Sequence, residues 1–293
     1  MMIIGKKTGQ LGNRLFLYAH LLAAAEEYGV ELRNPAFSEY ASLFPSTSSD
    51  LWCRYPVRSF SAGAPPKWSR NLLSRSVDLG GKLLSGFGSD FGHVKVIRLR
   101  AGEQYDLGSE EFASLIWSQH VLLQGWLFRS EHLLAKHADK IRDHFSIDAV
   151  TQSRVDARIN RLRQSADVVV GIHIRHGDYA TYLNGKYFYP TSHYASVMRQ
   201  IAEQLSPRKV GFLVCGNGEL RANDFNGLCV SCDRGGLLED LYAFADADLL
   251  FGPPSTFTGW ASFFGKVPID WLESEDHLPD ASGLLLEQSK QAA

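Results

Sequence analysis

Four side chains that can carry charge or donate hydrogen bonds follow an apolar run in VVVGIHIRHGDY, residues 168–179. They are His173, Arg175, His176 and Asp178. An arginine at the end of a strand offers a fixed fork of donors that suits phosphate or carboxylate. Side chains alternate along a strand, so His173 and Arg175 point the same way if the strand continues. The stretch predicts an anion site; the alternative is a surface ion pair between Arg175 and Asp178.

A second anion site is predicted in DLLFGPPSTFTGW, residues 248–260. An apolar strand leads there into a helix whose first turn contains Ser255 and Thr256. Unpaired backbone N–H groups and the helix dipole favour an anion at such a turn, and the two hydroxyls add donors. The alternative is that Ser255 only caps its helix, and both can hold because the geometry is shared. An arginine and a helix N-terminus together would form a metal-free diphosphate clamp.

The third stretch is GQLGN, residues 9–13, where glycines lie between an expected strand and an expected helix. Glycine lets a backbone approach a ligand closely, but a tight turn needs glycine as well. The pattern by itself leaves both interpretations open.

The elements that would position these residues alternate between strand and helix. Residues 1–5 and 30–35 read as strands on either side of a helix that ends at Gly29. In the second half, apolar runs predict strands at 167–174, 209–217, 248–252 and 267–272, with helices at 189–205, 237–247 and 254–265. Thr191 or Ser192 is the expected start signal of the first of these helices. The alternation predicts an α/β fold with parallel sheets, built as two Rossmann-like domains facing a cleft.

The expected domains are residues 1–150 and 151–293. Strands at 93–99 and 118–126 complete the first, and a helix is expected over 130–145. A charged helix, with Val150, Val155, Ile159 and Leu162 on its apolar side, would bridge the domains. Residues 36–92 contain many helix breakers and predict long loops and short helices.

Composition narrows the function classes. Among 293 residues, 45% are hydrophobic and 21% charged, and the formal net charge of −2 comes from scattered residues, so no nucleic-acid partner is expected. No apolar window approaches a membrane span and the N-terminus lacks signal-peptide features, which predicts a cytoplasmic protein without an integral membrane segment. Cys229 and Cys232 form a CxxC that could be a zinc or redox pair, but reduced cysteines fit its surroundings better. Asp246 and Asp248 fit a helix-to-strand junction, so no metal is expected.

In their order along the chain, with GQLGN near the start, HIRHGDY near the middle and STFTGW late, the three stretches resemble the α-1,2-fucosyltransferase family and its α-1,6- and protein O-fucosyltransferase relatives. GQLGNRLFLYA is similar to the family's GGLGNQMFQYA, HIRHGDY to HIRRGDY, and STFTGWAS to STFSWWGA. GWLFRSEHL, residues 125–133, is similar to the glycine-aromatic stretch before the family's interdomain helix. The likeness runs from residue 3 to about residue 270.

The resemblance implies a GT-B glycosyltransferase, similar to a galactoside 2-alpha-L-fucosyltransferase, with residues 1–150 as the acceptor-side domain and residues 151–293 as the nucleotide-sugar-binding domain. It would transfer fucose from GDP-fucose to a sugar hydroxyl of an oligosaccharide or polysaccharide, with inversion and without metal. The resemblance implies that Arg175 binds the diphosphate and that His173 and Asp240 contact the nucleoside. Ser255, Thr256 and the Phe257 backbone would complete the phosphate site. Gly12 and Asn13 would contact the sugar. Asp178 is the candidate base; alternatively it orients Arg175, or the proton goes to the departing phosphate.

The chain departs from the family pattern at four positions. His176 replaces the second arginine, Gln10 and Arg14 replace glycine and glutamine, and Gly259 replaces tryptophan. A histidine substitutes a pH-dependent charge for a permanent one beside the donor. Two alternatives therefore stay open: a different nucleotide sugar, or a non-catalytic nucleotide- or glycan-binding protein on the same fold.

Overall fold

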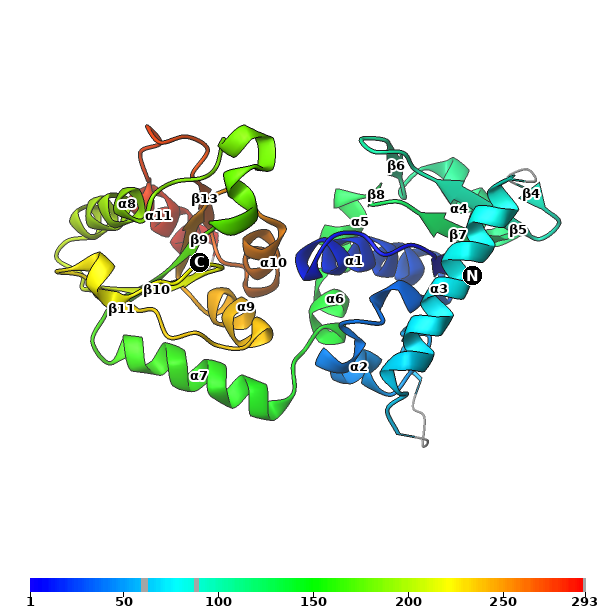
Figure 1. Ribbon diagram of the computed structural model, residues 1–293, viewed down its shortest axis with the longest axis horizontal. Coiled ribbons are helices and arrows are strands. Elements are labelled where there is room, and N and C mark those ends of the chain that lie inside the picture. Colours follow the sequence, from blue (N-terminus) through cyan, green and yellow to red (C-terminus); the bar gives the residue numbers. More distant parts are fainter. Residues whose placement is uncertain (59–62, 87–89, 292–293) are drawn as a thin grey trace. The chain divides into compact units, whose positions relative to one another are not determined.

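The computed structural model describes residues 1–58, 63–86 and 90–291, without the side chains of Asp90, Phe91, Asp178 and residues 289–291 (Figure 1). The chain divides into two compact units, Met1–Asp148 and Ala149–Ala293, here called the N-terminal and C-terminal units. Each has its own sheet and its own buried core. The roles expected for the two, acceptor side and nucleotide-sugar binding, stay predictions.

The C-terminal unit is built on five parallel strands. They are β9 (Val168–Ile174), β10 (Val210–Gly216), β11 (Cys229–Ser231), β12 (Leu249–Gly252) and β13 (Ile269–Trp271). Their order in the sheet is β11-β10-β9-β12-β13, so the chain winds outward from β9 first in one direction and then, from β12, in the other. This is the doubly wound Rossmann arrangement, with its topological switch point between β9 and β12.

Helices cover both faces of this sheet. They are α7 (Ala149–Arg163), α8 (Thr191–Gln204), α9 (Leu237–Ala245), α10 (Thr256–Gly265) and α11 (Ala281–Gln291). The buried core of one face joins α8 and α11 to strand residues such as Val170 and Ile172, whereas α9 packs against both α7 and α10 (Figure 1). Every residue of β9 is buried, as its continuous apolar run predicts for a central parallel strand. Three short 3-10 helices, Gly177–Ala180, Tyr182–Gly185 and Ala222–Phe225, lie in the connections.

The N-terminal unit has a six-stranded sheet in the order β3-β2-β1-β7-β5-β4. Its strands are β1 (Met2–Ile4), β2 (Leu32–Arg33), β3 (Arg54–Tyr55), β4 (Asp90–Phe91), β5 (Val94–Arg98) and β7 (His120–Gln124). The four inner strands are parallel and the two edge strands antiparallel. A separate pair joins β6 (Gln104–Asp106) to β8 (Leu127–Arg129).

The helices of this unit are α1 (Leu11–Tyr28), α2 (Pro45–Ser48), α3 (Lys67–Gly86), α4 (Glu110–Ser118), α5 (Glu131–Lys136) and α6 (Ala138–His144), with 3-10 helices at Pro35–Phe37 and Ala41–Leu43. Helix α1 ends at Gly29, whose φ of 64° is left-handed and whose N–H bonds to the carbonyl of Ala25. The predicted stop signal at Gly29 is therefore confirmed.

The prediction of loops and short helices over residues 36–92 is wrong for its second half, because α3 is a helix of 20 residues. Gly80 and Gly81, taken as breakers, lie inside it. A Cβ on Gly81 would lie 2.5 Å from Nε2 of Gln124 and 2.7 Å from Cδ2 of Leu122, so this glycine lets α3 approach β7. Tertiary packing here outweighs a weak local preference.

Three smaller expectations also need correction. The helix expected over 130–145 is two helices, separated at His137, whose side chain lies 2.6 Å from a carboxylate oxygen of Glu27. Helix α8 begins after Pro190 without a side-chain cap, so neither Thr191 nor Ser192 supplies one. Val150, expected on an apolar face, is exposed. In the part of the chain that the structure describes, no helix is long and apolar enough to cross a membrane.

Candidate functional site

The switch point of the C-terminal unit brings two of the predicted stretches together. Arg175 directly follows β9, and Ser255 lies three residues beyond the end of the neighbouring strand β12. Ligands of open α/β sheets bind beyond the carboxyl ends of the strands at such a point, because the connections diverge there and leave a crevice. The topology thus groups His173, Arg175, Ser255 and Thr256 at one edge of one sheet.

His173 is tied to the helix that begins at this edge. Its Nδ1 lies 2.6 Å from Oγ1 of Thr258, and both groups are buried. The imidazole is only 5% exposed and contacts the rings of Phe244 and Phe257. The nucleoside contact expected of His173 stays a prediction; what the structure shows is a bond that fixes α10 against β9.

Arg175 is oriented by an aromatic ring. Its guanidinium carbon lies 4.8 Å from the centroid of Tyr179, within the range of a cation–π contact. The hydroxyl of Tyr179 donates to the carbonyl of Pro254 at 2.7 Å, the residue just before Ser255. Tyr179 therefore connects the loop after β9 to the loop before α10, and it holds Arg175 beside the N-terminus of that helix.

Ser255 is the N-cap of α10. With φ −150° and ψ 135°, its Oγ accepts from the N–H of Phe257 at 3.2 Å. The capping interpretation is therefore confirmed. An anion at this turn would share the Phe257 N–H with Ser255, and the Thr256 hydroxyl stands in the same first turn. Phosphate binding by Ser255, Thr256 and Phe257 stays a prediction.

His176 is held by the loops around it. Its Nε2 lies 3.0 Å from the carbonyl of Tyr189, so this nitrogen carries a proton and donates. Its backbone exchanges hydrogen bonds with the side chain of Asn217, at 2.8 and 3.1 Å, and its ring lies beside Phe188. The residue that departs from the family pattern is thus a structural part of the loop after β9. The side chain of Asp178, the candidate base, lies outside the described residues.

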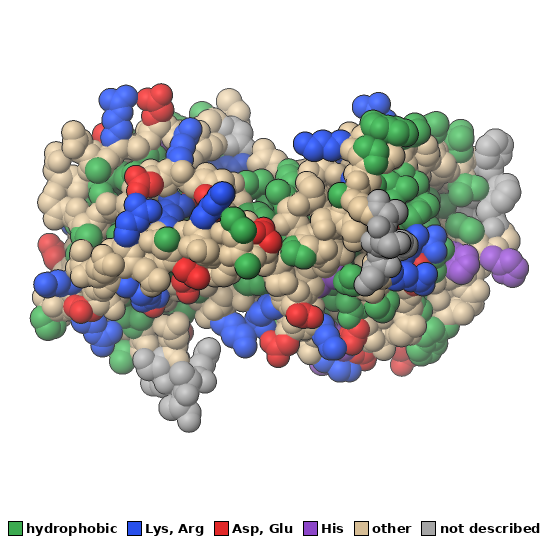
Figure 2. All heavy atoms as spheres, turned by 90° about the horizontal axis from the view of Figure 1, so that it is seen from below, with side chains coloured by type: hydrophobic (Ala, Val, Ile, Leu, Met, Phe, Trp, Pro, Cys, Tyr) green, Lys and Arg blue, Asp and Glu red, His purple; other side chains and the backbone are tan. Residues whose placement is uncertain are grey.

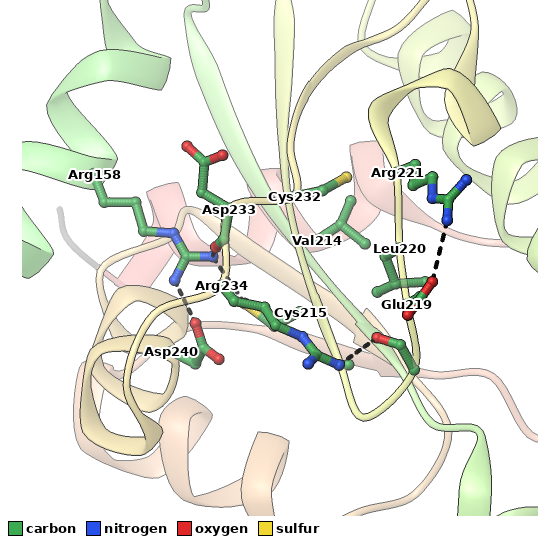
Figure 3. Close-up of a pocket in the computed structure, with 12 residues that line it drawn as sticks. Arg158, Val214, Cys215, Glu219, Leu220, Arg221, Cys232, Asp233, Arg234 and Asp240 are labelled. Carbon is green, nitrogen blue, oxygen red and sulfur yellow. Dashed lines mark hydrogen bonds and ion pairs between the residues drawn. The ribbon is translucent and has the colours of Figure 1, made fainter.

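A cavity of about 230 Å³ opens beside this edge, at the carboxyl end of β10 (Figure 3). Its lining comes from β10, from the loops on either side of β11, from α9 and from α7, and comprises Arg158, Val214, Cys215, Gly216, Gly218, Glu219, Leu220, Arg221, Cys232, Asp233, Arg234 and Asp240. Arg234 donates to the carbonyl of Gly218 at 2.6 Å, a bond drawn as a dashed line in Figure 3. The cavity combines an apolar wall with cationic and anionic groups, as a nucleoside requires.

Asp240, predicted to contact a nucleoside, lines this cavity and pairs with Arg158 (Figure 3). One oxygen of Asp240 accepts from Nη1 of Arg158 and, at 3.1 Å, from the N–H of Gly235. Arg158 also donates to the carbonyl of Asp233. Burial raises the pKa of the neighbouring Cys215 thiol, so it stays protonated and is not a nucleophile.

Arg158 was missed by the prediction, although the sequence contains a signal for it. It stands three residues after Val155 and four before Leu162, on the apolar side of α7, and its side chain is 7% exposed. A charged residue on a buried helix face requires a partner, which here is Asp240. Thr258 and Tyr179 were missed as well, because nothing local distinguishes them from ordinary polar residues.

Gly12 and Asn13 lie in the N-terminal unit, in the first turn of α1. Gly9 has φ 54°, and a Cβ there would lie 2.0 Å from Nδ2 of Asn13, so the glycine makes room for this amide. Arg14 pairs with Glu39 at 2.9 Å and stacks on Tyr40. Contact of Gly12 and Asn13 with a donor sugar stays a prediction.

Asp246 and Asp248 lie at the junction from α9 to β12, as predicted. Asp248 pairs with Arg163 at 3.0 Å and accepts from the N–H of Val169 at 2.7 Å. Cys229 and Cys232 are free thiols. Over the described residues, no group of three or more His, Cys, Asp or Glu side chains is arranged to hold a metal ion.

No protein-family model and no curated protein matches the chain. Solved structures, in contrast, do match the chain. A mutant of FUT1 from Arabidopsis thaliana in complex with GDP matches with a TM-score of 0.60 at 13% identity, covering 95% of this chain and 71% of that one. Fucosyltransferase NodZ from Bradyrhizobium matches with a TM-score of 0.55 at 18% identity, covering 95% and 97%. The fold is that of GT-B glycosyltransferases. The predicted α/β fold class with two Rossmann-like units is thereby confirmed.

Proposed function

We propose that the protein is a glycosyltransferase that transfers fucose from GDP-fucose to a sugar hydroxyl of an oligosaccharide or polysaccharide, with inversion and without metal. One observation carries the proposal. At the switch point of a Rossmann unit, Tyr179 holds Arg175 beside the N-terminus of α10, and the cavity with Asp240 opens next to it. A cation, a helix N-terminus and a nucleoside-sized cavity are the parts that a nucleoside diphosphate needs. The solved structures with this fold that are named above are fucosyltransferases.

The chemistry follows from where charge develops. When the bond between C1 of fucose and the β-phosphate breaks, negative charge grows on the phosphate and positive charge on the sugar ring. Arg175 and the N–H groups of α10 are fixed before the reaction, so they stabilise that charge without reorganising. The acceptor oxygen attacks C1 from the opposite face, its proton passing to Asp178 or to the departing phosphate. In its most specific form, the proposal is that the protein acts like a galactoside 2-alpha-L-fucosyltransferase.

Guanine suits the cavity because of Asp240. A carboxylate can accept from both N–H groups on the N1–N2 edge of guanine, whereas uracil offers one such N–H. Each carboxylate oxygen has two acceptor positions, so the oxygen of Asp240 that does not bond to Arg158 can accept from this edge while the other oxygen keeps the pair. Gly12 and Asn13 of the N-terminal unit are assigned to the sugar, as the motif resemblance implies.

Two alternatives have specific support. A different nucleotide sugar is favoured by His176, which lacks the permanent charge of the family's second arginine. A non-catalytic binding protein is favoured by the same residue together with Gln10, Arg14 and Gly259. Thermal-shift measurements with a panel of nucleotides distinguish the first alternative from the proposal. Stabilisation by UDP but not by GDP would contradict the proposal. Release of free fucose from GDP-fucose would exclude the second.

The decisive experiment is calorimetric titration of GDP into wild type, Arg175→Ala and Arg208→Ala. Arg208, which follows α8, is exposed, so Arg208→Ala is a matched control that also removes one cation. We expect Arg175→Ala to abolish measurable GDP binding and to lower kcat by about 10²–10³, the cost of losing one fixed donor to a developing oxyanion. Arg208→Ala should bind as wild type. Equal affinity in all three proteins would remove Arg175 from the phosphate site.

A further inference from the structure

Helix α3 of the N-terminal unit exposes a continuous apolar stripe. Trp68, Leu72, Leu79 and Leu83 are 57–70% exposed. At 100° per residue, these positions fall within one narrow sector of the helix. Single exposed apolar residues are ordinary, but four large ones in a row along 16 residues mark an interaction surface. This set of four is called the α3 stripe below.

The opposite side of α3 is anchored, which fixes the direction of the stripe. Arg70 is buried and donates to the carbonyls of Asp50 at 2.7 Å and Ser48 at 2.6 Å. Gly81 lies close against Gln124 and Leu122 of β7. Because both ends of the helix are held through that side, the α3 stripe faces away from the sheet of its own unit.

Basic residues border the stripe. Arg75 and Lys82 fall within about 40° of Trp68 around the helix axis, and both are exposed. The helix has four basic residues and one acidic residue, Asp78, which already pairs with Lys82 at 2.6 Å. The whole chain, in contrast, has a formal net charge of −2. The helix therefore has a net positive charge, although the chain as a whole does not.

The basic border continues beyond the C-terminal end of α3. A hollow of about 470 Å³ is lined there by Ser85 of the last helical turn, by Lys6 after β1, and by Arg98 and Arg100 at the end of β5. None of the described residues that line it is acidic. Figure 2, which shows one face of the molecule, has hydrophobic side chains and Lys or Arg side chains next to one another on the N-terminal unit.

We propose that α3 lies on the surface of an anionic membrane, with the α3 stripe in the interface and the basic border on the headgroups. A helix with a Trp and Leu face and a Lys and Arg margin binds in this way, since apolar burial and headgroup attraction add. Tryptophan prefers the interface, and the long stems of Arg75 and Lys82 can extend along apolar surface to reach phosphates. A second copy of the chain is the less suitable occupant, because a twofold contact would place this positively charged helix against itself.

The test is flotation of the full-length protein with vesicles of neutral phosphatidylcholine or of phosphatidylcholine with phosphatidylglycerol. We expect flotation only with the anionic vesicles, weakened by salt. Leu72→Gln/Leu79→Gln should reduce binding at least tenfold. The matched control, Leu278→Gln/Leu286→Gln, changes two leucines of similar exposure in the C-terminal unit and should bind as wild type.

Charge is tested separately. Arg75→Gln/Lys82→Gln should weaken binding to anionic vesicles by about fivefold for each charge removed. Arg208→Gln/Lys209→Gln, which removes two exposed cations elsewhere, should change it little. Circular dichroism and GDP affinity verify that each variant is folded. Equal binding to neutral vesicles, absence of binding to either, or a wild-type dimer that Leu72→Gln/Leu79→Gln dissociates would each overturn the proposal.

Discussion

Oγ1 of Thr258 lies 2.6 Å from Nδ1 of His173, and both side chains are buried. The bond joins the first turn of α10 to the carboxyl end of β9. The candidate anion site at the switch point between β9 and β12 depends on the position of α10 relative to β9. Thr258, which the motif comparison does not single out, is therefore placed to position the helix whose N-terminus we assign to the diphosphate.

Thr258→Val should lower the free energy of unfolding by about 1–3 kcal/mol, because the nearly isosteric valine leaves Nδ1 of a buried histidine without this partner. Chemical denaturation measures that loss. If the bond also positions α10, GDP affinity should fall in the same variant, while Thr258→Ser, which keeps the hydroxyl, should restore it. A variant with reduced stability and unchanged GDP affinity would limit Thr258 to a structural role.

Gly81→Ala should destabilise the protein, and Gly80→Ala should not. A Cβ at Gly81 would lie 2.5 Å from Gln124 and 2.7 Å from Leu122, whereas nothing lies within 4 Å of a Cβ at Gly80. Overpacking of this kind costs about 1–3 kcal/mol. Alanine at Gly80 should instead add about 0.5–1 kcal/mol through helix propensity. Thermal melts of the two variants side by side measure the difference, and equal melting temperatures would contradict the close contact between α3 and β7.

His144→Phe should stabilise the protein at neutral pH. The imidazole is buried among Tyr18, Tyr55 and Phe145, and neither ring nitrogen has a hydrogen-bond partner among the described residues. An unsatisfied buried polar group costs about 1–3 kcal/mol, which phenylalanine of similar shape would recover. His132→Phe, at an exposed position, is the control and should have little effect.

The same residue predicts a pH dependence. Burial lowers the pKa of His144 from 6.5 to about 4. Between about pH 6.5 and about pH 4, His144 binds a proton in the unfolded chain but not in the folded chain. The free energy of unfolding therefore falls as the pH drops from about 6.5 towards 4, by up to about 1.4 kcal/mol per pH unit. His144→Phe should remove this part of the slope. Denaturant unfolding at several pH values measures it, and an unchanged slope would show that His144 does not contribute.

His176→Arg should tighten GDP-fucose binding by about tenfold or more, since a charge-assisted hydrogen bond contributes about 1.5–3 kcal/mol. His176→Gln is the control, because an amide can still donate to the Tyr189 carbonyl but adds no charge. Calorimetry with both variants measures the effect. Binding that stays unchanged or weakens with arginine would favour a donor other than GDP-fucose.

The sequence alone determined strands β9, β10, β12 and β13 of the C-terminal unit and helices α7 to α10, but not β11 or α11. Strands β9, β10 and β12 are largely apolar runs, and α10 has its own start signal in Ser255. These are properties of neighbouring residues, so a local pattern records them. The same holds for the positions of Arg175 and Thr256 at strand-to-helix connections, which follow from where the strands end.

Tertiary structure alone decided the rest. Whether Gly81 breaks a helix depends on Gln124, and whether Arg158 is a surface charge depends on Asp240, a residue 82 positions away. Thr258 and Tyr179 gain their roles from His173 and Pro254 in the same way. The helical spacing of Arg158 indicates that it is buried, but no local pattern names the partner in any of these contacts, because their free energy comes from packing and desolvation between segments rather than from the propensity of either segment.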